Sequence, residues 1–312
     1  MGRSSRAKQD GTRQQKIAAQ RAAARRAQVR RRILVASGSI VAVVAIVVAF
    51  ALVKASSAPG TAAAGRAAPT GTALQSLVAE VTGVPDSVLN EAGTGGLPAS
   101  DSGTSNPDNA LATVSGPPLT SGGKPEVLYI GANYCPFCAA QRWAMIIALS
   151  RFGTFSGLTA SHSSTSDVYP DTATFTFYGS SYTSKYISFQ AVEETQNYRQ
   201  GNSSSQSVPY VTLQTPTAAE QALVAKYDGT SIPFIDIGNR YVQVGNLAPY
   251  GPQDLAGQSW SQIAAALRDP SSPIAREVDA SANYLTAAIG KLTGNQPASA
   301  ATPAVRAIEA TL

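Results

Sequence analysis

Both cysteines of the 312-residue chain lie in one motif, Cys135-Pro136-Phe137-Cys138. A thiol attacks only as the thiolate, and a free cysteine, with a pKa of about 8.5, supplies little thiolate at neutral pH. A helix N-terminus aims unpaired N–H groups and a positive dipole end at a nearby sulfur, which stabilises its anion. Because proline is tolerated in a first helical turn, the motif predicts a helix beginning at Pro136. Cys135 would then attack, and Cys138, one turn further in and less exposed, would resolve the mixed disulfide.

The same spacing is compatible with three other uses of the cysteines. Structural zinc normally takes four ligands, and the chain offers two cysteines and one histidine, His162, so zinc is disfavoured. Copper(I) accepts two thiolates, and a copper(I) carrier stays open. A structural disulfide between positions three apart closes almost no loop and gives little entropic stabilisation. We predict a redox-active disulfide, with no metal and no cofactor.

A strand and a helix are predicted on the two sides of the motif. Residues 126–131, EVLYIG, read as a buried strand, and the apolar spacing after Pro136 predicts a helix that ends near Arg151. Later segments are predicted as strands at 174–178, 186–192 and 209–213, a polar loop at 197–207 and a helix at 217–227.

The last third of the chain begins with a proline-led strand. The bond Ile232-Pro233 precedes the apolar run 234–237, Gly238-Asn239 predicts a two-residue hairpin turn, and the returning strand is 240–244. By strand alternation Asp236 points away from its apolar neighbours, and we expect it to face solvent. Helices are predicted at 253–267 and 273–292, followed by a frayed tail at 293–312.

The positive charge is concentrated at the N-terminus. Residues 1–32 hold eleven Lys or Arg and one acid, Asp10, a net charge of +10, so the remaining residues carry 5 − 10 = −5. Residues 33–53 contain no charged side chain, and as a helix they would span about 30 Å, the thickness of a bilayer's hydrocarbon layer. We predict a transmembrane helix there, because the apolar core of a cleavable signal peptide is shorter, about 7–15 residues.

The excess of Arg and Lys before this span predicts the orientation in the cell membrane. By the positive-inside rule the tail 1–32 is cytoplasmic and the chain after Lys54 is extracytoplasmic, in a single-pass protein. The tail would contact the anionic headgroups of the lipid bilayer or act only as a topology signal, and we expect no nucleic acid partner. An extracytoplasmic compartment permits disulfides, so the motif could be oxidised there.

Composition divides the rest of the chain. Residues 54–123 are rich in Ala, Gly, Ser, Pro and Thr and are predicted as a flexible linker, with short helices at 72–90 broken near Pro85. The compact extracytoplasmic domain is predicted at 124–292 and the C-terminal tail at 293–312.

The order of these elements resembles the thioredoxin fold. A strand followed by CPFC at a helix start, and much later a proline-led strand, hairpin and helix, is similar to dithiol enzymes that place a cis-proline opposite the reactive pair. The resemblance implies that role for Pro233 and requires an insertion around 161–227. The runs CAAQRWAMIIALSRFGTF, SHSSTSDVYP and SSYTSKYISFQAVE resemble the domain-of-unknown-function 929 family, membrane-anchored thioredoxin-like proteins without an established substrate, over residues 72–292.

The chain departs from the better-known dithiol enzymes at one position. Thioredoxins usually carry a buried acid six residues before the first cysteine, where this chain has Tyr129. Glu126, Glu193 and Glu194 are candidate replacements, each otherwise a surface carboxylate. Three further side chains have two interpretations: Arg142, a salt bridge or a means of lowering the thiol pKa; Trp143, core or substrate groove; and His162, surface or proton donor. Tyr134 is expected to cover the exposed edge of the Cys135 sulfur.

The predicted fold class is α/β: a thioredoxin-like fold with an insertion, preceded by one transmembrane helix and a flexible linker. The predicted activity is thiol–disulfide exchange on exported proteins, with Cys135 and Cys138 reacting and Pro233 presenting backbone to an extended substrate. Tyr134, Pro136, Phe137 and Ile232 are the expected substrate-binding residues. The expected partners are exported protein thiols or disulfides and a further redox protein. The second hypothesis is a non-catalytic binding module with a structural disulfide.

Overall fold

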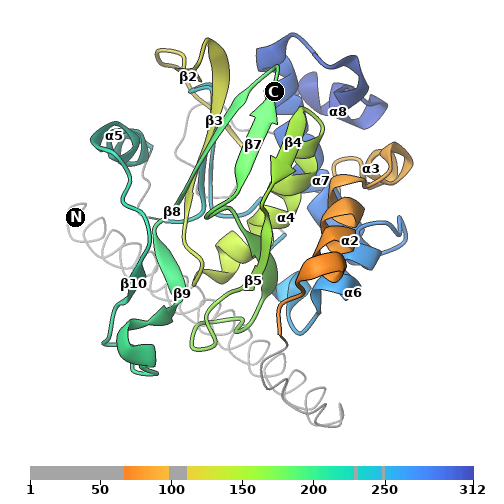
Figure 1. The fold of residues 1–312 in the computed structure, drawn as a ribbon. Helices are drawn as coiled ribbons and strands as arrows, with labels where there is room; N and C mark the ends of the chain where they lie inside the picture. The colour runs from red at the N-terminus through yellow and green to blue at the C-terminus, as the bar shows by residue number, and fades with distance from the viewer. Residues whose placement is uncertain (1–66, 98–110, 228–230, 248–249) are drawn as a thin grey trace, which may run out of the picture. The chain divides into compact units, whose positions relative to one another are not determined.

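The computed structural model describes residues 67–97, 111–227, 231–247 and 250–312 (Figure 1). The predicted basic tail, 1–32, and the predicted transmembrane helix, 33–53, lie outside these ranges. No helix within them combines the length and the apolar character needed to cross a bilayer.

A mixed sheet forms the centre of the described part. Its strands are β1 (Ala112–Thr113), β2 (Thr120–Ser121), β3 (Lys124–Gly131), β8 (Ser188–Glu193), β11 (Phe234–Ile237) and β12 (Tyr241–Val244). They follow the order β1-β12-β11-β3, with β2 and β8 also paired to β3. The β3–β8 pair is parallel and the other pairs are antiparallel. The chain is therefore a mixed α/β structure, as the sequence predicts at this coarser level.

Helices and three small two-stranded ladders surround this sheet. The ladders pair β4 (Gly153–Ser156) with β7 (Ser181–Ser184), β5 (Thr159–His162) with β6 (Ala173–Thr176), and β9 (Thr195–Arg199) with β10 (Tyr210–Thr212). The helices are α2 (Gly71–Thr82), α3 (Asp86–Ala92), α4 (Pro136–Ser150), α5 (Ala218–Lys226), α6 (Trp260–Ala266), α7 (Pro273–Thr293) and α8 (Pro303–Glu309), with 3-10 turns η1 (Gln200–Asn202), η2 (Pro252–Leu255) and η3 (Ala298–Ala300).

Alternation along the central strands divides the core into two layers. Tyr129 of β3 and Ile235 of β11 lie in the larger apolar cluster, which α4 and α7 complete. Leu128 and Phe234, their neighbours in sequence, lie in a smaller cluster that includes Val224 of α5. Helices therefore cover both faces of the sheet, α4 and α7 on one and α5 on the other (Figure 1).

Helix α4 begins with the predicted cysteine motif and runs through the larger apolar cluster. The sequence predicts one apolar face, but the helix is buried nearly all round, because α7 packs against it as well. Trp143 is fully buried, donates from Nε1 to the Ala173 carbonyl at 2.9 Å and packs edge-on against Phe175. This contact identifies Trp143 as a core residue and fixes the helix against β6.

Several segments that are predicted from the sequence to be flexible linker or frayed tail have defined secondary structure. β1 and β2 come from residues 111–123 and extend the sheet. The tail 293–312 is not frayed: it forms α8, which buries Val305 and Ile308. The single helix expected at 253–267 is wrong as well, since η2 and α6 are separated by a turn, and α6 starts afresh with Ser259 as its N-cap.

The expectation that Asp236 faces solvent is wrong. Its side chain does point away from Ile235 and Ile237, but that face of the sheet is covered by α5, and Asp236 is fully buried. One carboxylate oxygen, Oδ1, accepts the backbone N–H of Asn239 at 2.6 Å, while Oδ2 has no hydrogen-bond partner among the described residues. Burial raises the pKa of Asp236 to about 6.

Candidate dithiol site

Cys135 lies at the N-cap of α4, where β3 has just ended and Pro136 takes the first helical position. Its sulfur accepts the backbone N–H of Cys138 at 3.3 Å. The Cys135 Sγ also lies 3.8 Å from the carbonyl oxygen of Ile232, to which its thiol donates. The N-cap sulfur therefore faces both the first turn of its own helix and the proline-led segment.

The two thiols have different environments. Both are free, Cys138 is fully buried, and Cys135 is 5% exposed. The thiol of Cys138 donates to Cys135 and lowers the pKa of Cys135; burial opposes this, while the Cys138 N–H and the Arg142 cation add to it. Burial raises the pKa of Cys138 well above its ordinary value, and the hydrogen bond to Cys135 adds to this. Cys135 is the more acidic thiol, as an attacking group must be.

The segment opposite Cys135 precedes β11. The Ile232–Pro233 peptide bond is cis, and Pro233 is buried. The Pro233 carbonyl accepts the backbone N–H of Gly245 at 2.8 Å, which closes the end of the β11–β12 hairpin. The structure thus brings Ile232 and Pro233, far along the chain, to the start of α4.

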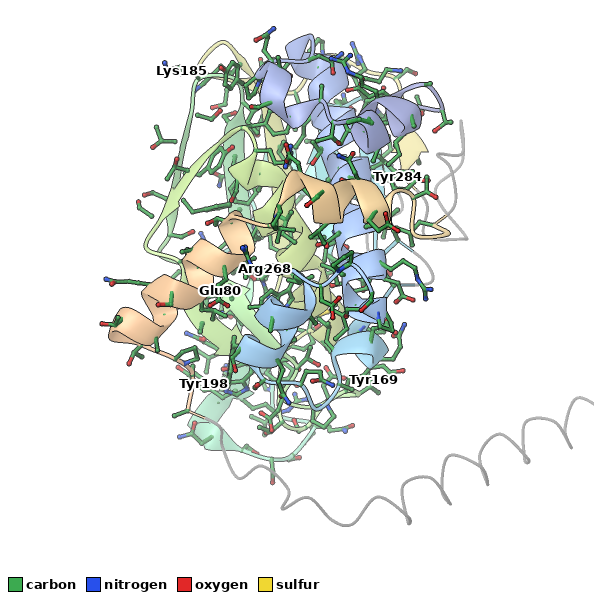
Figure 2. All side chains as sticks on the ribbon, turned by 90° about the vertical axis from the view of Figure 1, so that its right-hand side faces the viewer. Glu80, Tyr169, Lys185, Tyr198, Arg268 and Tyr284 are labelled. Carbon is green, nitrogen blue, oxygen red and sulfur yellow. The ribbon has the colours of Figure 1, made fainter. Side chains whose placement is uncertain are left out.

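Aromatic side chains border the dithiol on two sides. Tyr134 stacks on Tyr210 of β10, with ring centroids 4.2 Å apart, and burial raises the pKa of Tyr134 to about 12. Phe137 is 39% exposed and meets the edge of Tyr169 at a centroid distance of 6.4 Å. Figure 2 shows Tyr169 at the same end of the molecule as Tyr198, away from Lys185. Pro136 is buried, so Phe137 is the residue of the motif that offers most surface to a partner.

A buried ion pair lies behind the dithiol. Arg142, one helical turn after Cys138, donates from Nε to Glu193 Oε1 at 2.8 Å and from Nη2 to Oε2 at 2.7 Å. Both side chains are fully buried. Of the three candidate acids, Glu193 is therefore the one that reaches α4. Glu126 and Glu194 are half-buried, and burial raises the pKa of each.

The residues that form this site lie within the part of the chain that matches a known protein family. The family described as "Domain of unknown function (DUF929)" matches residues 110–291, more than half of the chain. The chain belongs to the DUF929 family. No curated protein and no solved structure matches this DUF929 chain. Its function therefore has to be argued from the chemistry of the dithiol and its surroundings.

Three buried amide side chains of the DUF929 chain link the first two turns of α4 to β12 and to the residues just after it. Asn246 donates from Nδ2 to the Phe137 carbonyl and to Gln141 Oε1, both at 3.1 Å. Gln243 donates to the same Gln141 oxygen at 2.8 Å. These residues cannot be recognised from the sequence, because neutral amides carry no spacing signature and come from separate elements. Their bonds fix the peptide between the two cysteines.

Two further candidates, His162 and Tyr129, have no hydrogen bond to either thiol among the described residues. His162, on β5, is about one-third exposed; its Nδ1 lies 3.0 Å from Asp171 Oδ1, a surface pair. Tyr129, six residues before Cys135, is fully buried, and its hydroxyl has no partner among the described residues. Burial raises the pKa of Tyr129 well above its ordinary value. It therefore stays neutral and cannot take the proton of a thiol at neutral pH.

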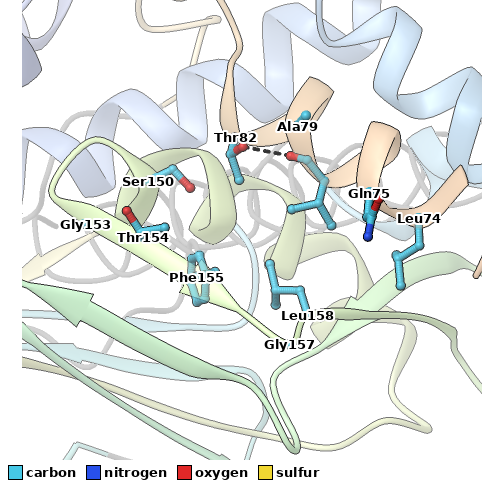
Figure 3. Close-up of a pocket in the computed structure, with 11 residues that line it drawn as sticks. Leu74, Gln75, Ala79, Thr82, Ser150, Gly153, Thr154, Phe155, Gly157 and Leu158 are labelled. Atoms are coloured by element: carbon cyan, nitrogen blue, oxygen red, sulfur yellow. Dashed lines mark hydrogen bonds between the residues drawn. The ribbon is translucent and has the colours of Figure 1, made fainter. Parts of the chain in front are cut away.

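Two hollows lie near α4. One, of about 600 Å³, lies between α2 and β4, with Val78, Ser150 and Phe155 in its wall (Figure 3). Ser150 is the last residue of the 15-residue α4, about 20 Å from Cys135 at 1.5 Å per residue. The other, of about 380 Å³, is lined by polar groups that include Ser164 and Arg199; Ser164 donates its N–H to the Tyr134 carbonyl at 2.9 Å, so this hollow adjoins the site.

No three metal-binding side chains converge in the part of the chain that the structure describes. The two thiols are thus the only pair of soft ligands at the site, and zinc would lack its usual four.

Proposed function

We propose that this DUF929 chain is a thiol–disulfide oxidoreductase that uses Cys135 and Cys138. The observation that carries the proposal is the position of the Cys135 sulfur: it caps a helix, accepts the Cys138 N–H at 3.3 Å and lies 3.8 Å from the Ile232 carbonyl. The cap stabilises a thiolate, and the second thiol is within hydrogen-bonding reach.

The exchange reaction follows from the different acidities of the two thiols. The Cys135 thiolate attacks one sulfur of a substrate disulfide; a bond forms between them, and the substrate's S–S bond breaks to release a thiolate. Cys138 then loses its proton and attacks the Cys135 sulfur, which forms the Cys135–Cys138 disulfide and releases the second substrate thiolate. The substrate gains two electrons and two protons, and the dithiol loses them. The reverse sequence oxidises a substrate dithiol.

The arrangement of elements supports a thioredoxin-like fold. β3 leads into α4 through the dithiol, β8 returns parallel to β3, and β11 and β12 form the antiparallel hairpin that follows the cis-proline. α7 then packs beside α4 on the same face of the sheet. The insertion expected around 161–227 corresponds in this proposal to the segments on either side of β8, which hold β6, β7, the β9–β10 ladder and α5.

A membrane anchor would place the dithiol in an oxidising compartment. The run at 33–53, with its basic flank, supports a single span and an extracytoplasmic domain. Exported proteins with thiols or disulfides would be the substrates, and a separate redox protein would recycle the dithiol, because the chain has no third cysteine.

Trapping tests this function in cells that express the full chain. In Cys138→Ala the mixed disulfide cannot be resolved, so we expect adducts between Cys135 and envelope proteins on non-reducing gels, released by a reductant. The matched control, Cys135→Ala, keeps one cysteine in the same motif but lacks the attacking group, and should form few adducts.

One observation favours a second candidate, a non-catalytic binding module. Cys135 is only 5% exposed, whereas Phe137 and Tyr169 beside it are each more than one-third exposed, so the surface offers more for binding than for attack. If Cys138→Ala gives no adducts above the Cys135→Ala control, the binding module replaces the enzyme as the proposed function.

Copper(I) carriage would appear instead as one copper ion bound per reduced chain, retained against a competing chelator.

A further inference from the structure

The Arg142–Glu193 pair differs from the other ion pairs of the described residues, because it alone has both side chains at 0% exposure. Removing two charges from water costs several kcal/mol, and well-packed apolar replacements are often neutral or stabilising. Stability alone is therefore a weak reason for such a pair. Its position on the dithiol helix suggests another reason.

The guanidinium of Arg142 is fixed to the segment that leads into the motif. Besides Glu193, its Nη2 donates to the Ala132 carbonyl at 2.9 Å and approaches Asn133 Oδ1 at 3.4 Å. Ala132 and Asn133 connect β3 to Cys135. The cation is thus held between the strand end and the first turns of α4, and it cannot swing into solvent.

Among the residues that the structure describes, the titratable groups that act on the two thiols are two tyrosines and Arg142. Tyr129 from β3 and Tyr134 from the segment before α4 are both kept neutral, since burial raises their pKa values. Arg142 contributes a positive charge that favours either thiolate. Glu193, on β8, acts through Arg142: its two oxygens hold the cation in place and partly offset its charge. Its Oε1 also accepts the Phe177 N–H at 3.3 Å, which anchors the carboxylate.

We propose that Arg142, positioned by Glu193, makes Cys135 more acidic and thereby shifts the thiol–disulfide equilibrium of the motif toward the reduced form. Arg142 and Glu193 are positioning residues, since neither makes or breaks a bond to sulfur. The effect on the equilibrium rests on the proposed function, whereas the effect on thiol acidity does not.

The test measures the pH dependence of Cys135 alkylation by iodoacetamide in the reduced full chain. Glu193→Gln keeps the cation and removes the carboxylate charge, so the pKa of Cys135 should fall and alkylation at pH 6 should be about threefold faster. Combining Arg142→Met with Glu193→Gln removes both charges of the pair, and the pKa of Cys135 should then rise by about one unit above that of Glu193→Gln, which slows alkylation at pH 6 about tenfold. The equilibrium with glutathione should shift toward the reduced form in Glu193→Gln and back in the double variant.

The matched control lies at the other end of the same helix. Arg151 Nη1 pairs with Asp86 Oδ1 at 2.9 Å, so Arg151→Met with Asp86→Asn makes the same charge change next to the C-terminus of α4. This control should leave the pKa of Cys135 unchanged. An unchanged pKa in Glu193→Gln would overturn the proposal and leave the pair a structural element. Glu193→Gln leaves a buried cation unpaired, so if it fails to fold the double variant decides: its alkylation at pH 6 should be about threefold slower than that of the parent, and an unchanged rate would overturn the proposal. A shifted pKa without trapped adducts would retain the inference and reject the oxidoreductase.

Discussion

Asp236→Asn is expected to stabilise the folded chain at neutral pH. In the folded state the Asp236 carboxyl is fully buried and its pKa is about 6, against an ordinary value of 3.8. The folded state therefore holds this proton more tightly than the unfolded chain does. The stability that the group contributes is complete below pH 4 and is lost as the pH rises through 6.

The pKa difference gives the size of the effect. A difference of about two units, at 1.36 kcal/mol per unit, corresponds to about 3 kcal/mol lost from the free energy of unfolding above pH 7. Asparagine is neutral at every pH, and its Oδ1 can still accept the Asn239 N–H that Asp236 accepts at 2.6 Å. We expect the variant and the parent to be equally stable near pH 4 and to differ by up to about 3 kcal/mol at pH 7.5.

Urea unfolding of the full chain from pH 4 to pH 8 measures this difference. Trp143 and Trp260 are both buried, so their fluorescence reports the loss of the core. Other buried carboxyls, such as Asp279, change the absolute stability but cancel when variant and parent are subtracted. Glu91→Gln, at an exposed position, is the control and should show no pH-dependent difference. A stability difference that is flat across this range, or a variant weaker at pH 7.5, would refute the reasoning.

Two further sites test the packing of the fold. Gly238 has φ +65° and a Cβ there would clash with Leu292 Cδ1, so Gly238→Ala should cost about 1–3 kcal/mol in urea unfolding, and adding Leu292→Ala should recover part of that loss. Ile308 of α8 is 1% exposed, so Ile308→Ala should cost about 2–5 kcal/mol. An unchanged midpoint for Ile308→Ala would mean that residues 293–312 fray, as the sequence alone suggests.

The parts of the fold that follow from local chemistry are predictable from the sequence. The turn Gly238–Asn239 has φ values of +65° and +53°, which glycine and asparagine tolerate best. Thr217 and Glu220 form the capping box that starts α5 close to its predicted position. Cys135 is the N-cap of α4 because Pro136 can occupy the first helical turn. In each case the residues that decide the geometry are sequence neighbours.

The parts of the fold that depend on residues distant in sequence cannot be predicted in this way. The strand β7 alternates between exposed and half-buried residues, so it has no apolar contrast to mark it. Asp236 is buried because α5 folds over its face of the sheet, which strand alternation cannot reveal. At the site, Arg142 is recognisable from its spacing to Cys138, but its partner Glu193 is 51 residues away. The stacking of Tyr210 on Tyr134 likewise joins separate elements.

The redox equilibrium of the CPFC pair tests the central claim most directly. The full chain is equilibrated with mixtures of reduced and oxidised glutathione, quenched in acid and alkylated, and the free thiols are counted by mass. We predict that Cys135 and Cys138 are oxidised together in one reversible step, with a midpoint between about −120 and −270 mV, the range of exchange enzymes. A midpoint below about −300 mV, typical of structural disulfides, would contradict the account.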